Sequence, residues 1–284
     1  MENIQIKYQG SFKRAKKAGR KISMITAYDY TSACLVNKSG IDCILVGDSL
    51  GNVIQGHDST LPVTMDEMIY HGKIVRRGAP GKFLVLDMPF GSYQGSEDDA
   101  VIHAGRFIKE CGAQAVKLEG AGRFLPLISR LTESSVPVMG HLGLTPQSIH
   151  NFGSYRVQGK TDEDAERLVC DAVALERAGC FAIVLELVVS ECAKRISENV
   201  SVPTIGIGSG IGCDGQVLVF HDLLGLNPDF KPKFVKTYTD GAQQFISAFN
   251  QYHKEITDGT FPGPEHSFFR EKKSDNDYNS AKLY

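Results

Sequence analysis

Four short, largely apolar runs in this chain each end in a carboxylate. The runs are 44–47, 83–86, 115–118 and 182–185, and the acids that close them are Asp48, Asp87, Glu119 and Glu186. Such runs, apolar on both faces, are typical of buried parallel strands. A charge at the end of a strand leaves the core at the carboxyl edge of the sheet, where α/β proteins bind ligands. The four acids therefore predict a divalent cation and a base at one edge of a sheet, and so an enzyme.

Strand and helix patterns alternate along the whole chain. Eight strands are expected, with helical patterns between most of them, at 23–28, 42–47, 83–88, 114–119, 136–141, 181–187, 202–207 and 216–220. Eight such units in 284 residues predict an α/β fold, a (β/α)8 TIM barrel. The alternative is an open doubly wound sheet, but no glycine fingerprint follows the first strand.

Three helices carry start signals in the sequence. They are expected to begin at Thr64, Ser96 and Thr161, because each of these N-cap residues is followed by acids in the first turn. Glycines at 78, 112 and 179 are expected to end them. One barrel domain is predicted over residues 1–269, followed by a polar, flexible tail over 270–284.

Composition restricts the class of protein. The chain is 42% hydrophobic and 23% charged, with a net charge of -2, which predicts a soluble globular protein that binds neither nucleic acid nor membrane. Its seven cysteines include no C-x-x-C pair, so buried free thiols and a cytoplasmic location are expected. We expect neither a signal peptide nor a membrane span.

Three of the acids, Asp48, Asp87 and Glu119, follow successive strands. Because the ends of adjacent barrel strands converge on one pocket, these oxygen ligands suit Mg²⁺. The alternative is that each acid caps the next helix or pairs with a cation. Lys117 lies two residues before Glu119 and therefore shares its face of the strand. It is expected either to bind an anionic substrate or to balance the acids.

Glu186 follows the sixth strand, across the barrel from the metal candidates. A carboxylate there could face a bound substrate as general base, with its pKa raised by burial, or it could be a salt-bridged rim acid. His141 ends the fifth strand and is a candidate for proton transfer or for a structural hydrogen bond. Ser209 is a second candidate supporting residue, in the glycine-rich segment 206–212, which is expected either to bind an anion or to form a loop with positive φ.

These segments together resemble the ketopantoate hydroxymethyltransferase family over roughly residues 7 to 268. The segments that carry the resemblance are 24–29, 46–51, 56–64, 87–93, 116–120, 140–148, 206–210, 214–219 and 261–268. The resemblance implies a barrel of the phosphoenolpyruvate/pyruvate type and Mg²⁺ held by the acids at 48, 87 and 119. It also implies substrate contacts from Asp48, Ser49, Asp87 and Lys117, and a proton-accepting Glu186.

The family's reaction belongs to pantothenate biosynthesis. As the resemblance implies it, a hydroxymethyl group passes from 5,10-methylenetetrahydrofolate to 3-methyl-2-oxobutanoate, giving 2-dehydropantoate through a Mg²⁺-stabilised enolate. The family also implies a cytoplasmic homodecamer. Two alternatives stay open: a Mg²⁺-dependent lyase or aldolase that acts on an oxo acid without folate, and a non-catalytic barrel that serves in assembly or binding.

Overall fold

The structure, a computed structural model, describes residues 4–154, 156–228 and 232–270. It divides into two compact units, Met1–Tyr238 and Thr239–Tyr284, which are described separately. The expectation of one domain over residues 1–269 stays a prediction. Apart from Arg270, the predicted tail lies outside the described residues.

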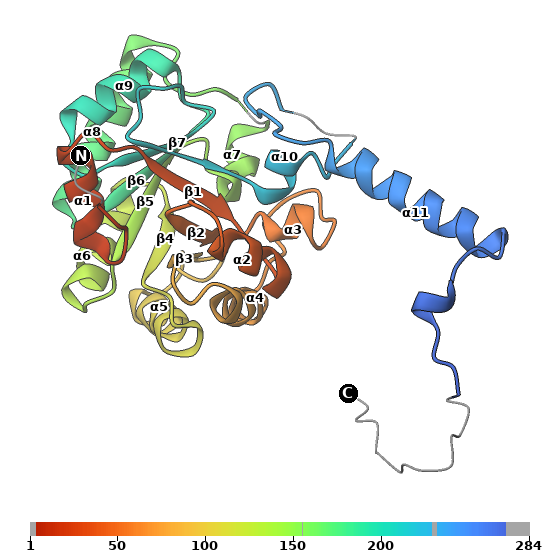
Figure 1. The fold of residues 1–284 in the computed structure, drawn as a ribbon. Helices are drawn as coiled ribbons and strands as arrows, with labels where there is room; N and C mark the ends of the chain where they lie inside the picture. The colour runs from red at the N-terminus through yellow and green to blue at the C-terminus, as the bar shows by residue number, and fades with distance from the viewer. Residues whose placement is uncertain (1–3, 155, 229–231, 271–284) are drawn as a thin grey trace. The chain divides into compact units, whose positions relative to one another are not determined.

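Eight parallel strands close a barrel in the first unit, in the order in which they occur in the chain (Figure 1). Their bounds are β1 (Ile22–Thr26), β2 (Cys43–Val46), β3 (Phe83–Asp87), β4 (Ala115–Glu119), β5 (Val138–Gly143), β6 (Ala182–Glu186), β7 (Thr204–Ile207) and β8 (Gly215–Leu218). The predicted barrel is therefore confirmed, and the alternative of an open sheet is excluded because β8 pairs with β1.

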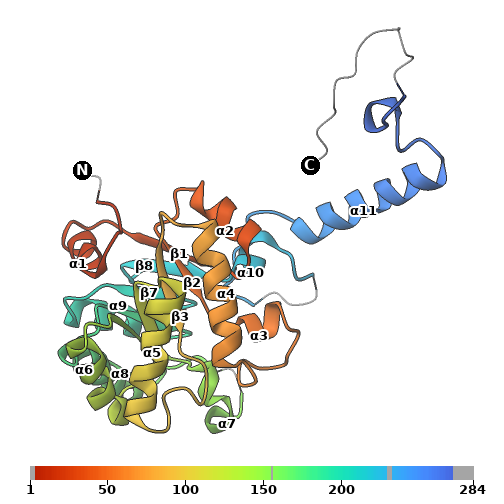
Figure 2. The same cartoon turned by 90° about the horizontal axis from the view of Figure 1, so that it is seen from below.

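Helices surround most of the barrel, and α4 and α5 lie side by side in both views (Figures 1 and 2). The outer helices are α2 (Tyr30–Asn37), α4 (Met65–Gly78), α5 (Glu97–Cys111), α6 (Leu125–Glu133), α8 (Asp162–Arg177) and α9 (Ser190–Asn199). Shorter helices follow several strands at the rim: α3 (Leu50–Val53), η1 (Gly122–Phe124), η2 (Pro146–Ser148), α7 (Ile149–Phe152) and α10 (Phe220–Leu224). None of the helices in the described ranges is long and apolar enough to cross a membrane.

The three predicted helix starts are confirmed by their caps. The Thr64 side chain accepts a hydrogen bond from the Glu67 N–H, and the Glu67 carboxylate accepts one from the Thr64 N–H, which completes a capping box. The side chains of Ser96 and Thr161 likewise accept backbone hydrogen bonds at the starts of α5 and α8. Gly78 differs from the prediction, because it is the last residue of α4. A Cβ at Gly78 would lie 2.6 Å from the Tyr30 carbonyl oxygen, so this glycine allows α4 to pack closely on α2.

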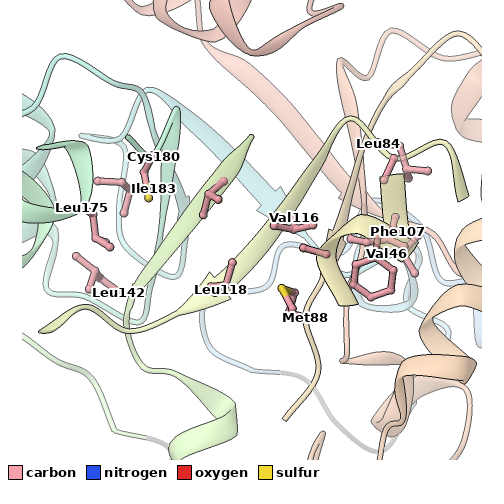
Figure 3. Close-up of a cluster of buried hydrophobic side chains, with 14 of the residues drawn as sticks. Val46, Leu84, Met88, Phe107, Val116, Leu118, Leu142, Leu175, Cys180 and Ile183 are labelled. Carbon is pink, nitrogen blue, oxygen red and sulfur yellow. The ribbon is translucent and has the colours of Figure 1, made fainter. Parts of the chain in front are cut away.

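Apolar side chains form two layers, one on each face of the barrel wall. Inward-pointing residues such as Met24, Val85 and Val184 fill the barrel. Outward-pointing strand residues pack against the surrounding helices, and Figure 3 shows part of this layer, with Phe107 from α5 and Leu175 from α8. Because both faces of each strand are buried, the strands read as continuous apolar runs in the sequence.

The amino-terminal end of the barrel is closed by helix α1 (Gln9–Lys17). Phe12 is fully buried there, with its ring centroid 5.0 Å from that of Phe83 and 4.9 Å from that of Phe181. Both contacts have the edge-to-face geometry that aromatic pairs favour. This end of the barrel is therefore sealed by packing.

The glycine-rich segment after β7 is a loop with positive φ at Gly208 and Gly210, which confirms one of the two alternatives considered for it. Residues 208–214, all of them described, contain no helix and carry the chain directly from β7 to β8. A Cβ at Gly210 would lie 2.2 Å from Ser190 Oγ, and a Cβ at Gly212 would lie 2.7 Å from Lys194 Cβ. The glycines at 210 and 212 therefore let this loop pack closely against α9.

The second unit contains α11 (Gly241–Thr257) and the short η3 (Pro264–His266). The Asp240 side chain caps α11 by accepting a hydrogen bond from the Gln243 N–H. Large apolar side chains recur at helical spacing along α11 and are exposed: Phe245, Ile246, Phe249, Tyr252 and Ile256. This pattern marks α11 as an amphipathic helix.

Candidate active site

Five charged or ionisable side chains reach the carboxyl-terminal mouth of the barrel from strands β3 to β6. Alternation along the strands points four of them the same way as inward apolar residues two positions earlier, and it points Glu119 the same way as Lys117. The strand register then pairs Asp87 with Lys117 and Glu119 with His141. Glu186 lies opposite Gly143, on the strand next to His141. The barrel thus brings together side chains that are far apart in the sequence.

Asp48 enters the site from a turn rather than from a strand. Strand β2 ends at Val46, and the backbone N–H of Asp48 then donates a hydrogen bond to Asp87 Oδ2 at 3.1 Å. A Cβ at Gly47 would lie 2.7 Å from Ser49 Oγ and 3.3 Å from Asp87 Oδ2, so only glycine leaves room there. The Ser49 hydroxyl lies 2.7 Å from the hydroxyl of Tyr28, which orients it.

A continuous set of polar contacts joins the predicted site residues. Lys117 Nζ lies 3.0 Å from Asp87 Oδ1 and 3.1 Å from His141 Nδ1. His141 Nδ1 also lies 3.3 Å from Glu119 Oε1, and its Nε2 lies 3.3 Å from Glu186 Oε2. Glu186 is therefore separated from Glu119 by the width of one imidazole ring. The sequence suggested a wider separation across the barrel.

Burial and crowding of like charges raise the pKa values of two acids. Burial raises the pKa of Asp48 well above its usual value, and the nearby charges of Asp87 and Glu119 raise it further. Burial also raises the pKa of Asp87, and Lys117 opposes that rise. For Glu119, burial would raise the pKa, but His141, Lys117 and the backbone N–H of Gln147 together lower it below its usual value.

The acids raise the pKa values of both basic groups. Burial would lower the pKa of Lys117, but the charges of Asp87, Glu119 and Asp48 raise it above its usual value. Burial and Lys117 would also lower the pKa of His141, yet Glu119 and Glu186 raise it overall. Three buried carboxyl groups thus face one ammonium and one imidazole, so acidic groups outnumber basic groups at the mouth.

The acids suit a hard divalent cation, although they do not form a complete cage. Among the described residues, no three His, Cys, Asp or Glu side chains are arranged as a full ligand set for one ion. Asp87 Oδ1 is buried without a hydrogen bond in good geometry, despite its short distance from Lys117. Mg²⁺ is commonly held by one or two carboxylates, with water and substrate oxygens as the other ligands. Asp48 and Asp87, with Glu119 nearby, fit that pattern.

The backbone around Glu186 is fixed by its neighbours. Its carbonyl accepts a hydrogen bond from the Leu144 N–H at 2.8 Å, and its side chain is 20% exposed, more than those of the other acids. The Ser209 hydroxyl donates to the Leu185 carbonyl at 2.7 Å and accepts from the Val188 N–H at 3.1 Å. Ser209 thus ties down the turn that carries Glu186. A direct role for Ser209 towards substrate stays a prediction.

Two residues that sequence reasoning did not single out are central to the site. Gln147, in η2, donates hydrogen bonds to Asp48 from its side chain and to Glu119 from its backbone. The hydroxyl of Tyr93, in the loop after β3, donates to the Gln147 side chain at 2.8 Å. Both lie in loops, where no periodic pattern marks a buried polar residue. Their only signal was their place in the segments that carry the family resemblance.

Comparison with known proteins gives consistent matches. The profile of the family described as ketopantoate hydroxymethyltransferase matches residues 7–264. The 3-methyl-2-oxobutanoate hydroxymethyltransferase of Thermotoga maritima is 56% identical over 257 residues, which is 90% of this chain and 95% of that protein. The protein of the same name from Enterococcus faecalis is 52% identical over 258 residues, which is 91% of this chain and 94% of that protein.

Solved structures of low sequence identity share the fold. A phosphonopyruvate hydrolase, in a complex with oxalate and Mg²⁺, superposes with a TM-score of 0.58 at 13% identity, covering 92% of this chain and 93% of that one. A 2,3-dimethylmalate lyase, described as a member of the PEP mutase/isocitrate lyase superfamily, superposes with a TM-score of 0.57 at 14% identity. That match covers 94% of this chain and 91% of the lyase. At this identity the likeness confirms the type of barrel.

Proposed function

The chain belongs to the ketopantoate hydroxymethyltransferase family, and we propose that it transfers a hydroxymethyl group from 5,10-methylenetetrahydrofolate to 3-methyl-2-oxobutanoate, giving 2-dehydropantoate. The enzyme class, a one-carbon transferase, and the oxo acid substrate follow from that membership. The observation that carries the mechanism is the His141 ring, which lies between the buried acids and the more exposed Glu186.

The difficult step is removal of the proton from C3 of the oxo acid. Glu186 is placed to accept it, because its carboxylate is at the mouth and has no cation other than His141 beside it in the described structure. The His141 ring lies 3.3 Å from Glu119 Oε1 through Nδ1 and 3.3 Å from Glu186 Oε2 through Nε2, so it links the two carboxyl groups and can pair with Glu186. The resulting enolate carbon then attacks the methylene carbon of the folate donor as one of its C–N bonds opens to give an iminium. Water replaces the remaining C–N bond, which completes the hydroxymethyl group and releases tetrahydrofolate.

Lys117 and Ser49 are proposed to bind the oxo acid. Lys117 remains protonated and is 5% exposed, so its charge acts in a poorly solvated environment on the carboxylate or on the developing enolate oxygen. The Ser49 hydroxyl, oriented by Tyr28, is available to the substrate.

Mg²⁺ is proposed to be held by Asp48 and Asp87, with Glu119 beside them. When bound, it would supply Lewis-acid polarisation of the oxo acid's keto oxygen, an effect worth several kcal/mol. The excess of carboxylates over cations and the buried oxygen of Asp87 support this assignment. A cytoplasmic homodecamer is proposed on the family resemblance alone.

Deuterium exchange at C3 of 3-methyl-2-oxobutanoate tests the assignment of the base. We expect Glu186→Gln to bind Mg²⁺ and the oxo acid as the wild type does, but to lose exchange in D₂O. Glu191→Gln, on the exposed face of α9, is the matched control and should exchange at the wild-type rate. Undiminished exchange in Glu186→Gln would remove Glu186 as the base.

A second assay tests the donor. The wild type with Mg²⁺ and the oxo acid should form 2-dehydropantoate only when 5,10-methylenetetrahydrofolate is present. Cleavage or condensation of the oxo acid without folate would instead favour the lyase or aldolase alternative.

A further inference from the structure

Gln147 is a buried amide that contacts two of the three proposed metal acids. Its side-chain nitrogen, Nε2, donates to Asp48 Oδ2 at 2.8 Å and to the Met88 carbonyl at 2.9 Å. Its backbone N–H donates to Glu119 Oε2 at 3.0 Å. The residue is 6% exposed, so these bonds are shielded from water. Gln147, which lies in η2 after β5, therefore links Asp48, which follows β2, to Glu119, which ends β4.

The orientation of this amide is determined by its partners. Its oxygen, Oε1, accepts from the Tyr93 hydroxyl at 2.8 Å and from Gln94 Nε2 at 3.1 Å. Both N–H groups and both lone pairs are thus used, which is the full hydrogen-bonding capacity of the side chain. Rotating the amide by half a turn would place its oxygen against the Asp48 carboxylate and the Met88 carbonyl, both acceptors. The side chain consequently has one stable orientation.

This orientation decides which carboxylate oxygens remain available. Gln147 donates to Asp48 Oδ2 and to Glu119 Oε2, while Glu119 Oε1 lies 3.3 Å from His141 Nδ1. Among the described residues, Asp48 Oδ1 is therefore left without a hydrogen bond. We propose that Gln147 is a positioning residue that holds Asp48 and Glu119 for a divalent cation, with Tyr93 fixing its amide. The inference rests on the proposed metal site and adds to it the residues that orient its ligands.

Gln147 resembles the residues that donate hydrogen bonds to metal-binding carboxylates in other proteins. Hydrogen bonds to ligating carboxylates fix their direction, and removal of such a partner weakens metal affinity by about 10- to 100-fold. If the role of Gln147 were purely structural, its substitution would lower thermal stability without changing the affinity of the site for the metal. Metal affinity and thermal stability therefore distinguish the two roles.

The experiment measures Mn²⁺ binding to the full chain by electron paramagnetic resonance, with Mn²⁺ alone as the probe in place of Mg²⁺. Gln147→Met keeps the length of the side chain and the backbone N–H but removes the amide. We expect its Kd for Mn²⁺ to rise about 10- to 100-fold. The melting temperature is recorded for each variant.

Gln114→Met is the matched control. Gln114 precedes β4, at the opposite end of the barrel, and its oxygen accepts from Arg76 at 2.5 Å and from the Leu84 N–H at 2.8 Å. This variant should melt at a lower temperature and keep the wild-type Kd. Tyr93→Phe leaves Gln147 in place and removes only the hydroxyl, so it tests the inference even if Gln147→Met does not fold. Its Kd is expected to rise about fivefold.

The outcomes separate this inference from the proposed function. If the wild type binds Mn²⁺ and both Gln147→Met and Tyr93→Phe bind it equally well, the positioning role is wrong and the metal site stands. If the wild type binds no Mn²⁺, the metal site and the positioning role both fail. A raised Kd in the two variants with an unchanged Kd in Gln114→Met supports the inference.

Discussion

The two ends of the barrel differ in how their charged side chains are paired. At the amino-terminal end, Lys16 Nζ donates to the carbonyls of Ser197 and Val202 and pairs with Asp214 at 2.9 Å, so its three donors are used. At the carboxyl-terminal end, three buried carboxyl groups share Lys117 and His141, and burial raises the pKa values of Asp48 and Asp87.

The difference shows which end stabilises the fold and which end carries the chemistry. The amino-terminal end combines paired charges with the aromatic contacts of Phe12, and both favour the folded state. The carboxyl-terminal end keeps like charges close together in a buried place, which costs stability unless a ligand binds. In TIM barrels the active site lies at the carboxyl-terminal face.

The largest effect should follow a change at the carboxyl-terminal end. Asp87→Asn keeps the acceptor for the Asp48 N–H but removes a charge from the proposed metal site. We expect kcat/KM to fall about 10³-fold, because metal polarisation of the substrate is worth several kcal/mol. Steady-state kinetics and calorimetric titration with Mg²⁺ and the oxo acid measure the effect. Near-normal activity would mean that Asp87 is not a ligand.

The matching change at the amino-terminal end is Phe12→Ala. It removes a fully buried ring from contact with Phe83 and Phe181, so the free energy of unfolding should fall by about 3–5 kcal/mol. Urea unfolding gives this value. The protein that remains folded should keep its kcat/KM and its Mg²⁺ affinity. Loss of Mg²⁺ affinity in the folded variant would show that the two ends are not independent.

Removal of charge at the carboxyl-terminal end should stabilise the metal-free protein. The pKa of Asp48 is raised in the folded state, so the folded state holds its proton to a higher pH than the unfolded state. Stability therefore falls as pH rises from about 4, the ordinary carboxyl range, through the raised pKa. Asp48→Asn should remove this loss and raise the free energy of unfolding by about 0.5–2 kcal/mol at pH ~7. It should also abolish activity.

Urea unfolding with a metal chelator, repeated across that pH range, checks this prediction. The wild type and Asp48→Asn should have similar stability at the acidic end and diverge as pH rises. In the variant, the new amide oxygen can still accept the hydrogen bond that Gln147 donates to Asp48 in the wild type. A variant that is less stable than the wild type at every pH would contradict the account.

The smallest effect should come from a paired charge at the amino-terminal end. A guanidinium nitrogen of Arg20 lies 2.5 Å from Asp42 Oδ1, and the Arg20 side chain is 31% exposed. Arg20→Met should therefore lower the free energy of unfolding by about 0.5–1 kcal/mol. The loss should shrink at high salt, because screening weakens the pair in the wild type. Asp42 keeps its bonds from the Ser23 N–H and hydroxyl. A larger, salt-independent loss in thermal unfolding would show that the pair is not an ordinary surface ion pair.

The sequence predicted the barrel and most of the site because both depend on strand ends. Apolar runs located all eight strands to within two residues, and the acids that close four runs lie at one mouth. Strand alternation also predicted that Lys117 and Glu119 share a face. The pairing of Asp87 with Lys117 and of Glu119 with His141 required the register, which short apolar runs leave open.

Loops limited what could be predicted. The glycines of segment 206–212 predicted a loop with positive φ as one alternative, but they do not reveal the α9 surface against which Gly210 and Gly212 pack. Gln147 and Tyr93 follow no periodic pattern, because their role depends on hydrogen bonds to residues of other loops. The roles of Asp48, Asp87, Glu119 and Glu186 stay predictions, although the structure brings these residues together as the sequence suggested.

A crystal structure with Mg²⁺ and 3-methyl-2-oxobutanoate would show directly whether the metal acids and the base are separate groups. We expect the ion to lie about 2.1 Å from carboxylate oxygens of Asp48 or Asp87. The Glu186 carboxylate should face C3 of the substrate and make no contact with the ion. An ion bound by Glu186, or a substrate whose C3 points away from it, would contradict the division between metal acids and base.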